Sequence, residues 1–316
     1  MVIPTRDRHR FLNLTLKSIL EQARDHGHLK NLAVVVSDQS GEEGVKANRK
    51  VVARFNKKYG NKIHYFPPGS VARVARVLQS APQEEQAAFE RLVPEDGHWG
   101  AHRNRLSLLG ALVAGRKFGL ERALQAVYLH LDDDTPLLRL RAPVANSSSK
   151  IVSSDGRLTR IPEDVLGFFV DGFEQARSRS RSGFCHGFYG VFDAHVSQNG
   201  TPFSSLRGKL RTPGAVFRHG GSGPGRALDF NAFSYPYHPH GSDEDFLHSS
   251  KVRPAHSEYR RFENFVTHIG FKGARPEVGR HDYYRRLSPD RVAAWKSLAF
   301  RMAQFGAGSR RKAKRS

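Results

Sequence analysis

The sequence is poor in cysteine, in acidic residues and in long apolar runs, and each shortage excludes a class of protein. Cys185 is the only cysteine, so the chain forms no internal disulfide and no zinc site built from several thiolates. This suits a reducing compartment. No apolar run approaches the roughly 20 residues of a membrane-spanning helix, and the first residues lack a signal-peptide pattern. We therefore expect a cytoplasmic protein.

The charges that are present are mostly basic. Lys and Arg total 51 against 30 Asp and Glu, which gives a net charge of +21 over 316 residues. Such an excess attracts phosphates, whether these belong to a nucleotide, a nucleic acid or an anionic membrane surface. With 38% hydrophobic residues, the chain is long enough to build one large domain or two modest ones.

The first part of the chain alternates between apolar runs typical of strands and patterns typical of helices. Strand signals at residues 2–5, 32–36 and 62–66 enclose an amphipathic helix after residue 8 and a basic helix at residues 45–59. This alternation predicts an α/β fold with a mainly parallel sheet flanked by helices.

Two helical stretches come next. Residues 70–99 lack strand signals and include an acidic helical stretch at residues 83–92, which predicts a helical insertion. Residues 100–119 form a further predicted helix that ends at Gly119 and leads into the next apolar run.

That apolar run ends in three carboxylates. Residues 126–138 read AVYLHLDDDTPLL, so Asp132, Asp133 and Asp134 follow a predicted buried strand. Ligand sites of open α/β sheets lie at the carboxyl ends of strands. Adjacent carboxylates repel one another unless a cation offsets them, and a hard divalent ion bridging to a diphosphate would do so. A solvated junction of strand and loop, with Asp133 pointing away, is the alternative interpretation.

The second half of the chain has two further charged features. Residues 241–246 read GSDEDF, so three acids precede a segment that could be helical. Acids are also favoured at a helix N-terminus for purely structural reasons. The tail at residues 306–316 is basic and poor in apolar residues, which predicts disorder.

In their order and spacing, five motifs resemble those of family 2 glycosyltransferases with the GT-A fold, which are inverting enzymes that use nucleotide-diphosphate sugars. The motifs, spread over residues 2–246, are VIPTRDR, VVVSDQS, AHRNRLSLLGALVAG, YLHLDDDT and GSDEDF. The resemblance implies a hexosyltransferase-like enzyme with a mixed, mainly parallel sheet. Residues 1–140 would bind the nucleotide sugar, and residues 141–305 would bind the acceptor and supply the catalytic base.

The resemblance also implies individual donor-binding residues. Asp38 takes the place of the acid that contacts the nucleobase, and Arg103 and Asn104 take that of a pair that holds the nucleotide. In the DxD motif, the first and last acids serve the ribose or sugar and the metal. The expected substrate-binding set is Pro4, Thr5, Arg6, Asp38, Arg103, Asn104, Asp132 and Asp133.

The expected cofactor is a divalent metal, Mn²⁺ or Mg²⁺. Asp134 and Asp132 match its carboxylate ligands, and His268 lies where some members supply a third ligand. Histidine is a plausible ligand for manganese, although both metals lean towards oxygen. His256 and His281 are the rival candidates for that third place.

Inverting transfer also needs a carboxylate that removes the proton of the acceptor hydroxyl. By residue matching this base is Asp245, with Glu244 as the residue that orients it, and Asp243 stays open as an alternative. The positive charge of the chain suggests an anionic or lipid-linked glycan as acceptor, reached through peripheral contact with an anionic inner membrane face.

Two other classes of function remain open at this point. A nucleic-acid-binding protein would explain the net charge, since phosphate contacts dominate such binding. A metal-dependent nucleotidyltransferase or phosphohydrolase would use the three acids equally well. The first class leaves the acids at strand ends unexplained, and the second gives the GSDEDF segment no task.

Overall fold

The computed structural model describes residues 1–94, 99–129, 131–140, 158–167, 170, 186–196, 210–211, 216–218, 259–271 and 289–313. Glu244 and Asp245, the expected base and its neighbour, lie outside these residues, as do Asp243, His256 and His281.

The apolar runs of the N-terminal part form a parallel sheet. Its strands are β1 (Val2–Thr5), β2 (Val34–Asp38) and β3 (Ile63–Phe66), in the order β1-β2-β3. The connections are α1 (His9–Asp25), followed by the short η1 (His28–Lys30), and α2 (Glu42–Tyr59). This confirms the α/β class and the helices that flank a parallel sheet.

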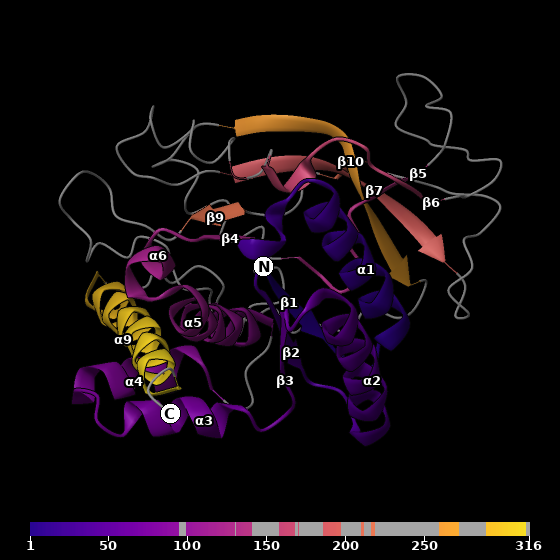
Figure 1. Cartoon of the computed structure of the whole chain (residues 1–316). Coiled ribbons are helices and arrows are strands. Elements are labelled where there is room, and N and C mark those ends of the chain that lie inside the picture. Colours follow the sequence, from indigo (N-terminus) through magenta and orange to yellow (C-terminus); the bar gives the residue numbers. More distant parts are fainter. Residues whose placement is uncertain are drawn as a thin grey trace, which may run out of the picture.

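Helices cover the two faces of this sheet, and Figure 1 shows α1 and α2 on one side with α5 (Trp99–Phe118) and α9 (Pro289–Ala313) on the other. Successive strand residues point to opposite faces. Ile3 and Val34 therefore enter the core with α1 and α2, whereas Val2 and Val35 enter the core with α5 and α9. The continuous apolar runs of these strands result from burial on both faces.

The strand that precedes the acids forms a separate two-stranded sheet and leads the chain to the other edge of the parallel sheet. It is β4 (Val127–Leu129), which pairs antiparallel with β9 (Val216–Arg218). Just beyond β4, Leu131 donates its backbone N–H to the carbonyl oxygen of Val2 at 3.1 Å. The carbonyl of Met1 faces β2, and neighbouring carbonyls of a strand point in opposite directions. The acid segment therefore lies beside β1, on the side away from β2.

The segment expected as a helical insertion contains α3 (Val71–Leu78) and α4 (Gln83–Leu92). After α5, the short α6 (Leu120–Leu124) leads into β4.

The remaining strands lie over one end of the molecule in Figure 1. β5 (Leu138–Leu140) pairs antiparallel with β6 (Leu158–Arg160). β7 (His186–Val196) pairs parallel with β10 (Tyr259–Phe271) and antiparallel with β8 (Leu210–Arg211).

The expectation of disorder from residue 306 was wrong for residues 306–313, because α9 continues through them. The reason is packing: α9 crosses α5 closely, and Trp295, Met302 and Ala303 are buried in the core beneath it. An ion pair between Arg301 of α9 and Glu85 of α4, with Nε and Oε2 2.5 Å apart, also anchors the helix. No helix in the described part of the chain is long and apolar enough to cross a membrane.

The crossing of α5 and α9 depends on glycine. A Cβ atom on Gly306 would overlap the carbonyl oxygen of Leu112 and lie 2.8 Å from the backbone nitrogen of Arg116, whereas one on Gly308 would meet nothing within 4 Å. Gly306→Ala should therefore lower the free energy of unfolding by about 1–3 kcal/mol through overpacking.

The matched substitution Gly308→Ala, in the same helix, should raise the free energy of unfolding by up to about 1 kcal/mol, because alanine has the higher helix propensity. Urea unfolding of the two variants measures both effects. Equal effects of the two substitutions would contradict this close crossing.

Candidate functional site

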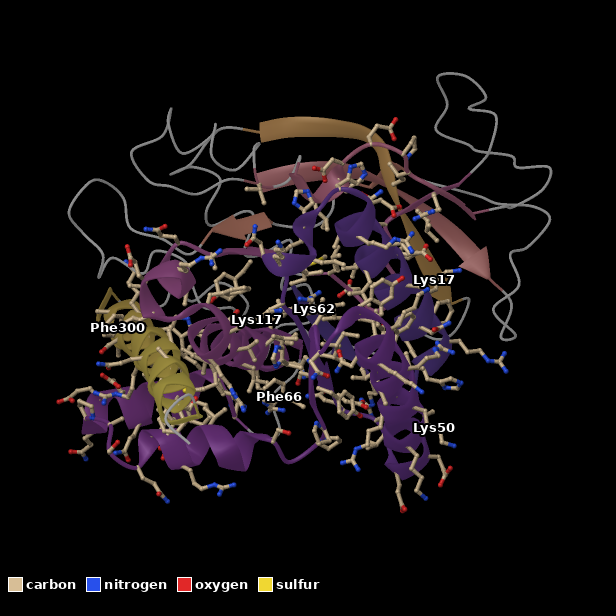
Figure 2. The ribbon with its side chains drawn as sticks, in the orientation of Figure 1. Lys17, Lys50, Lys62, Phe66, Lys117 and Phe300 are labelled. Carbon is tan, nitrogen blue, oxygen red and sulfur yellow. The ribbon has the colours of Figure 1, made fainter. Side chains whose placement is uncertain are left out.

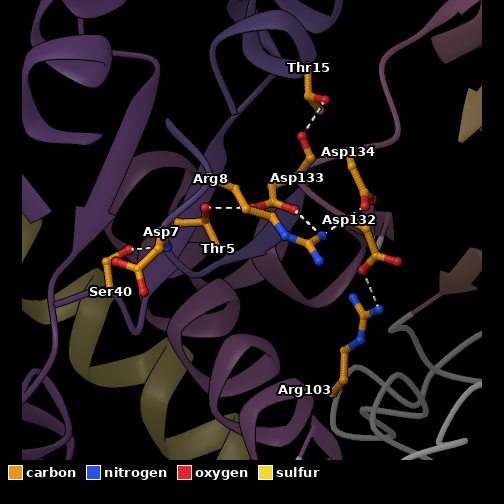
Figure 3. Close-up of polar contacts among 9 residues, drawn as sticks. All are labelled: Thr5, Asp7, Arg8, Thr15, Ser40, Arg103, Asp132, Asp133 and Asp134. Atoms are coloured by element: carbon orange, nitrogen blue, oxygen red, sulfur yellow. Dashed lines mark hydrogen bonds and ion pairs between the residues drawn. The ribbon is translucent and has the colours of Figure 1, made fainter. Parts of the chain in front are cut away.

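The three acids lie where the sequence placed them, at the carboxyl edge of the parallel sheet. The loop after β1 approaches the acid segment from one side and the start of α5 from another, as Figure 3 shows. The junction is not fully solvated, since Asp133 and Asp134 are both buried, whereas the side chain of Asp132 is 40% exposed.

Asp133 anchors the acid segment to the sheet. Its Oδ2 accepts a hydrogen bond of 2.7 Å from the hydroxyl of Thr5, at the end of β1. Its backbone carbonyl accepts another, also 2.7 Å long, from the hydroxyl of Thr15 in α1. Burial raises the pKa of the Asp133 carboxyl above its ordinary value, and the neighbouring charge of Asp134 raises it further. Asp133 thus faces the protein interior rather than solvent.

Arg8 pairs with the two buried acids. Its Nη1 lies 2.8 Å from Oδ2 of Asp134 and 3.5 Å from Oδ1 of Asp133. Arg8 comes directly before α1, in the VIPTRDR motif. The sequence alone did not indicate this pairing, because it depends on β1 lying beside the acid segment.

Asp132 pairs with a second arginine. Nη2 of Arg103, in α5, lies 2.6 Å from Oδ1 of Asp132. Asn104, the other member of the expected nucleotide pair, donates instead to the backbone carbonyl of Leu92 at 2.8 Å. Arg103 therefore joins the acids, whereas Asn104 holds the end of α4 against α5.

Asp38, the expected nucleobase contact, is buried, and its carboxylate accepts hydrogen bonds from neighbouring residues. Its Oδ1 accepts the backbone N–H of Ser40 at 2.7 Å. Its Oδ2 accepts the side-chain amide of Asn48 at 2.8 Å and the hydroxyl of Tyr65. Burial and this hydrogen bond raise the pKa of Tyr65, so its hydroxyl stays protonated as a donor. Asp38 thereby fixes the turn between β2 and α2.

The loops after β1 and β2 are joined by Asp7, a second residue that the sequence reasoning missed. Asp7 donates its backbone N–H to Oγ of Ser40 at 2.7 Å, and its Oδ1 accepts the backbone N–H of Gly41 at 3.0 Å. Its φ of 54° is a left-handed conformation that non-glycine residues seldom adopt. Such strain persists where the surrounding contacts enforce it, as they do at ligand sites.

The remaining predicted site residues lie in different parts of the fold. Pro4 is buried in β1, opposite Ser37 of β2, and Arg6 is exposed in the following loop. His268 lies in β10, in register with Asp193 of β7, and β10 contacts β5 just beyond the acids. The role of His268 as a third metal ligand stays a prediction.

The acid edge offers oxygen atoms of the kind that hard divalent cations prefer, although Asp132 and Asp134 are each paired with an arginine. Asp132 and Asp134 offer only oxygen, and Mg²⁺ is commonly held by one or two carboxylates together with substrate phosphates and water. Among the described residues, no group of three His, Cys, Asp or Glu side chains could hold a metal ion by itself. A metal here would therefore need further ligands, such as water or a bound phosphate, to complete its coordination.

No protein-family model, curated protein or solved structure matches the chain. Function is therefore inferred from the residues of the site and their geometry.

A buried histidine lies next to the acid edge of the sheet. His102 lies beside Arg103 near the start of α5 and hydrogen-bonds to the backbone of Ser37 at the end of β2. Burial lowers its pKa, and together with the charges of Arg105 and Arg103 brings it to about 3. The imidazole is therefore neutral in the folded protein, whereas unfolding exposes it to protonation.

The free energy of unfolding should consequently decrease as the pH falls below the ordinary histidine value of 6.5. One such histidine contributes a slope approaching about 1.4 kcal/mol per pH unit, until the folded-state pKa is reached. Urea unfolding at a series of pH values between these limits measures the slope.

His102→Gln should reduce this slope, whereas the same substitution at the exposed His9 of α1 should leave it unchanged. An unchanged slope in His102→Gln would show that His102 is already protonated or exposed in the folded state.

Proposed function

We propose that this chain is a metal-dependent inverting glycosyltransferase of the GT-A type. It would transfer a hexosyl group from a nucleotide-diphosphate sugar to an acceptor hydroxyl. The observation that carries the proposal is the meeting of three carboxylates with two arginines, Arg8 and Arg103, at the carboxyl edge of a parallel sheet. That edge is where open α/β sheets bind their ligands.

A cluster of both signs suits a nucleoside diphosphate as leaving group. As the bond to the sugar breaks, negative charge grows on the phosphate oxygens, and guanidinium groups bind such oxygens through two parallel hydrogen bonds. A nucleic-acid-binding surface needs the arginines but gains nothing from buried carboxylates beside them. The cluster therefore favours the transferase over the nucleic-acid-binding alternative.

Different residues of the chain would bind the metal, bind the nucleobase and remove the acceptor proton. Asp132 and Asp134, with His268 as a third candidate, would hold Mn²⁺ or Mg²⁺, which supplies Lewis-acid stabilisation of the leaving diphosphate. Asp133 keeps both acids in place through Thr5. Asp38 shapes the turn next to which the nucleobase would bind. Asp245, oriented by Glu244, would remove the acceptor proton.

The acceptor we propose is an anionic or lipid-linked glycan, met in the cytoplasm or at its membrane face. The net charge of +21 supports this choice. Exposed lysines such as Lys17 of α1 and Lys50 of α2 spread positive charge over the helices on one side of the sheet, as Figure 2 shows. Charge of one sign steers anionic partners towards a protein.

A panel of nucleoside diphosphates, added with and without Mn²⁺, tests donor binding by thermal shift. One nucleoside diphosphate should stabilise the protein only when Mn²⁺ is present, by about 2.7 kcal/mol at a concentration of 100 Kd. Asp134→Asn should abolish the metal-dependent part, and Glu121→Gln, an exposed acid of α6, should not. Metal-independent stabilisation that survives Asp134→Asn would count against the metal site.

Turnover tests the base separately from the binding site. Hydrolysis of sugar nucleotides without acceptor would identify the donor, and transfer to acceptor would then be compared between variants. Asp245→Asn should lower transfer by about 10²–10⁴-fold while donor affinity stays near wild type, because a base acts only in the transition state. Should Asp243→Asn show that loss instead, the base is Asp243, and if neither shows it the proposed transfer mechanism is wrong.

A further inference from the structure

A pocket lies at the amino-terminal end of the parallel sheet, away from the acid edge. Its volume is about 360 Å³, and it is lined by residues at the starts of β1, β2 and β4 and in the second half of α5. Protein interiors are close-packed, and voids larger than a water molecule are few. A cavity of about 150 Å³ with apolar walls stays dry and holds benzene. This pocket therefore has room for a larger apolar molecule.

The floor of the pocket is apolar and buried. Val113 and Ala114 of α5 and Val35 of β2 line it, and all three are buried. Gly110 lies one turn before Ala114, and a Cβ atom on it would be 2.9 Å from the ring of Tyr128. Gly110 thus lets this ring lie against α5, and the small Ala114 on the same face of the helix leaves space between α5 and the sheet.

The rim of the pocket is polar and carries an arginine. Arg122 of α6 is exposed, and its Nη2 donates to Oδ1 of Asn31 at 3.0 Å. Its guanidinium carbon lies 5.5 Å from the centre of the Phe118 ring. Since all three residues line the pocket, these contacts hold the guanidinium at the rim. A guanidinium has five N–H donors, and within the described part of the chain Arg122 uses one.

The charges around the pocket favour an anion. None of the described residues that line it is acidic, whereas Arg122 is basic, and Asp164 is engaged in a pair with the lining residue His28. Lys117, labelled in Figure 2, adds a cation, since its Nζ lies 5.4 Å from the centre of the Phe118 ring. Burial, together with the charge of a neighbouring lysine, lowers the pKa of Lys117 to about 8, so the amine is still mostly protonated at pH 7.

We propose that this pocket binds a small apolar acid, with its rings or alkyl chain on the apolar floor and its anionic group on Arg122. A guanidinium binds a carboxylate through two parallel hydrogen bonds. The two long chains of a membrane lipid would exceed the volume of the pocket, so the ligand is a soluble molecule. This inference does not depend on the proposed function, because the pocket and the acid edge lie at opposite ends of the sheet.

Two fluorescent dyes that share one aromatic core test the pocket and its preference for an anion. Anilinonaphthalene sulfonate is anionic, and phenylnaphthylamine is the same core without the sulfonate. Fluorescence titration of the full chain should give one site per chain for each dye. Arg122→Gln should weaken the binding of the anionic dye by about tenfold, a factor that corresponds to one hydrogen bond to a charged group, and leave the neutral dye unchanged. Octanoate should displace the anionic dye, and about tenfold less effectively in Arg122→Gln.

Two further variants complete the test. Arg116→Gln is the matched control, since Arg116 is exposed in α5, does not appear among the described lining residues and carries the same charge. It should leave both affinities near wild type. Ala114→Phe should abolish the binding of both dyes while the Tm stays equal or rises, because the added ring enters empty space. Should Ala114→Phe fail to fold, Ala126→Phe fills the pocket from the start of β4.

The outcomes decide the two parts of the proposal separately. If both dyes bind and Arg122→Gln weakens both equally or neither, the pocket has no preference for acids and the role of Arg122 is overturned. If neither dye binds at one site per chain, or if binding persists in the variants that fill the pocket, the pocket is not a binding site. Neither result changes what the panel of nucleoside diphosphates reports about the acid edge.

Discussion

The acid edge depends on the hydrogen bond between the hydroxyl of Thr5 and the buried carboxyl of Asp133. A buried carboxyl is expensive unless its oxygens are hydrogen-bonded, so this contact favours the register in which the acid segment docks on β1. The same segment is tied to α1 twice, by Thr15 at the backbone of Asp133 and by Ser18 at the backbone nitrogen of Leu137. Asp132 and Asp134 are thereby held on either side of a fixed residue.

A second set of polar contacts fixes the conformation of the loops after β1 and β2. Asp38 organises the turn after β2, and Asp7 fastens the loop after β1 to that turn. Gly44 packs directly against Ser40, because a Cβ atom on it would lie 2.6 Å from the Cβ of Ser40. These contacts fix the loops at the edge of the sheet, and a fixed edge reduces the ordering cost of binding a ligand there.

The sequence was most informative where a pattern is local. Apolar runs and helical spacing predicted the three parallel strands and their helices, and the run before Asp132 predicted an acid cluster at a strand end. Pairing between distant residues was harder to read: Arg8 meets Asp134 only because β1 lies next to the acid segment. The helix through residues 306–313 escaped prediction because its composition resembles a disordered tail, and packing against α5 decides its structure.

The packing of α9 on α5 has a consequence for the order in which the protein can fold as it is synthesised. α5 belongs to the N-terminal part of the chain, yet the core that it shares with Val2 and Val35 is closed by Trp295 and Leu298 of α9. That core stays open on the ribosome until α9 has emerged, and exposed apolar surface of this kind favours aggregation. Contacts so distant in sequence also slow folding.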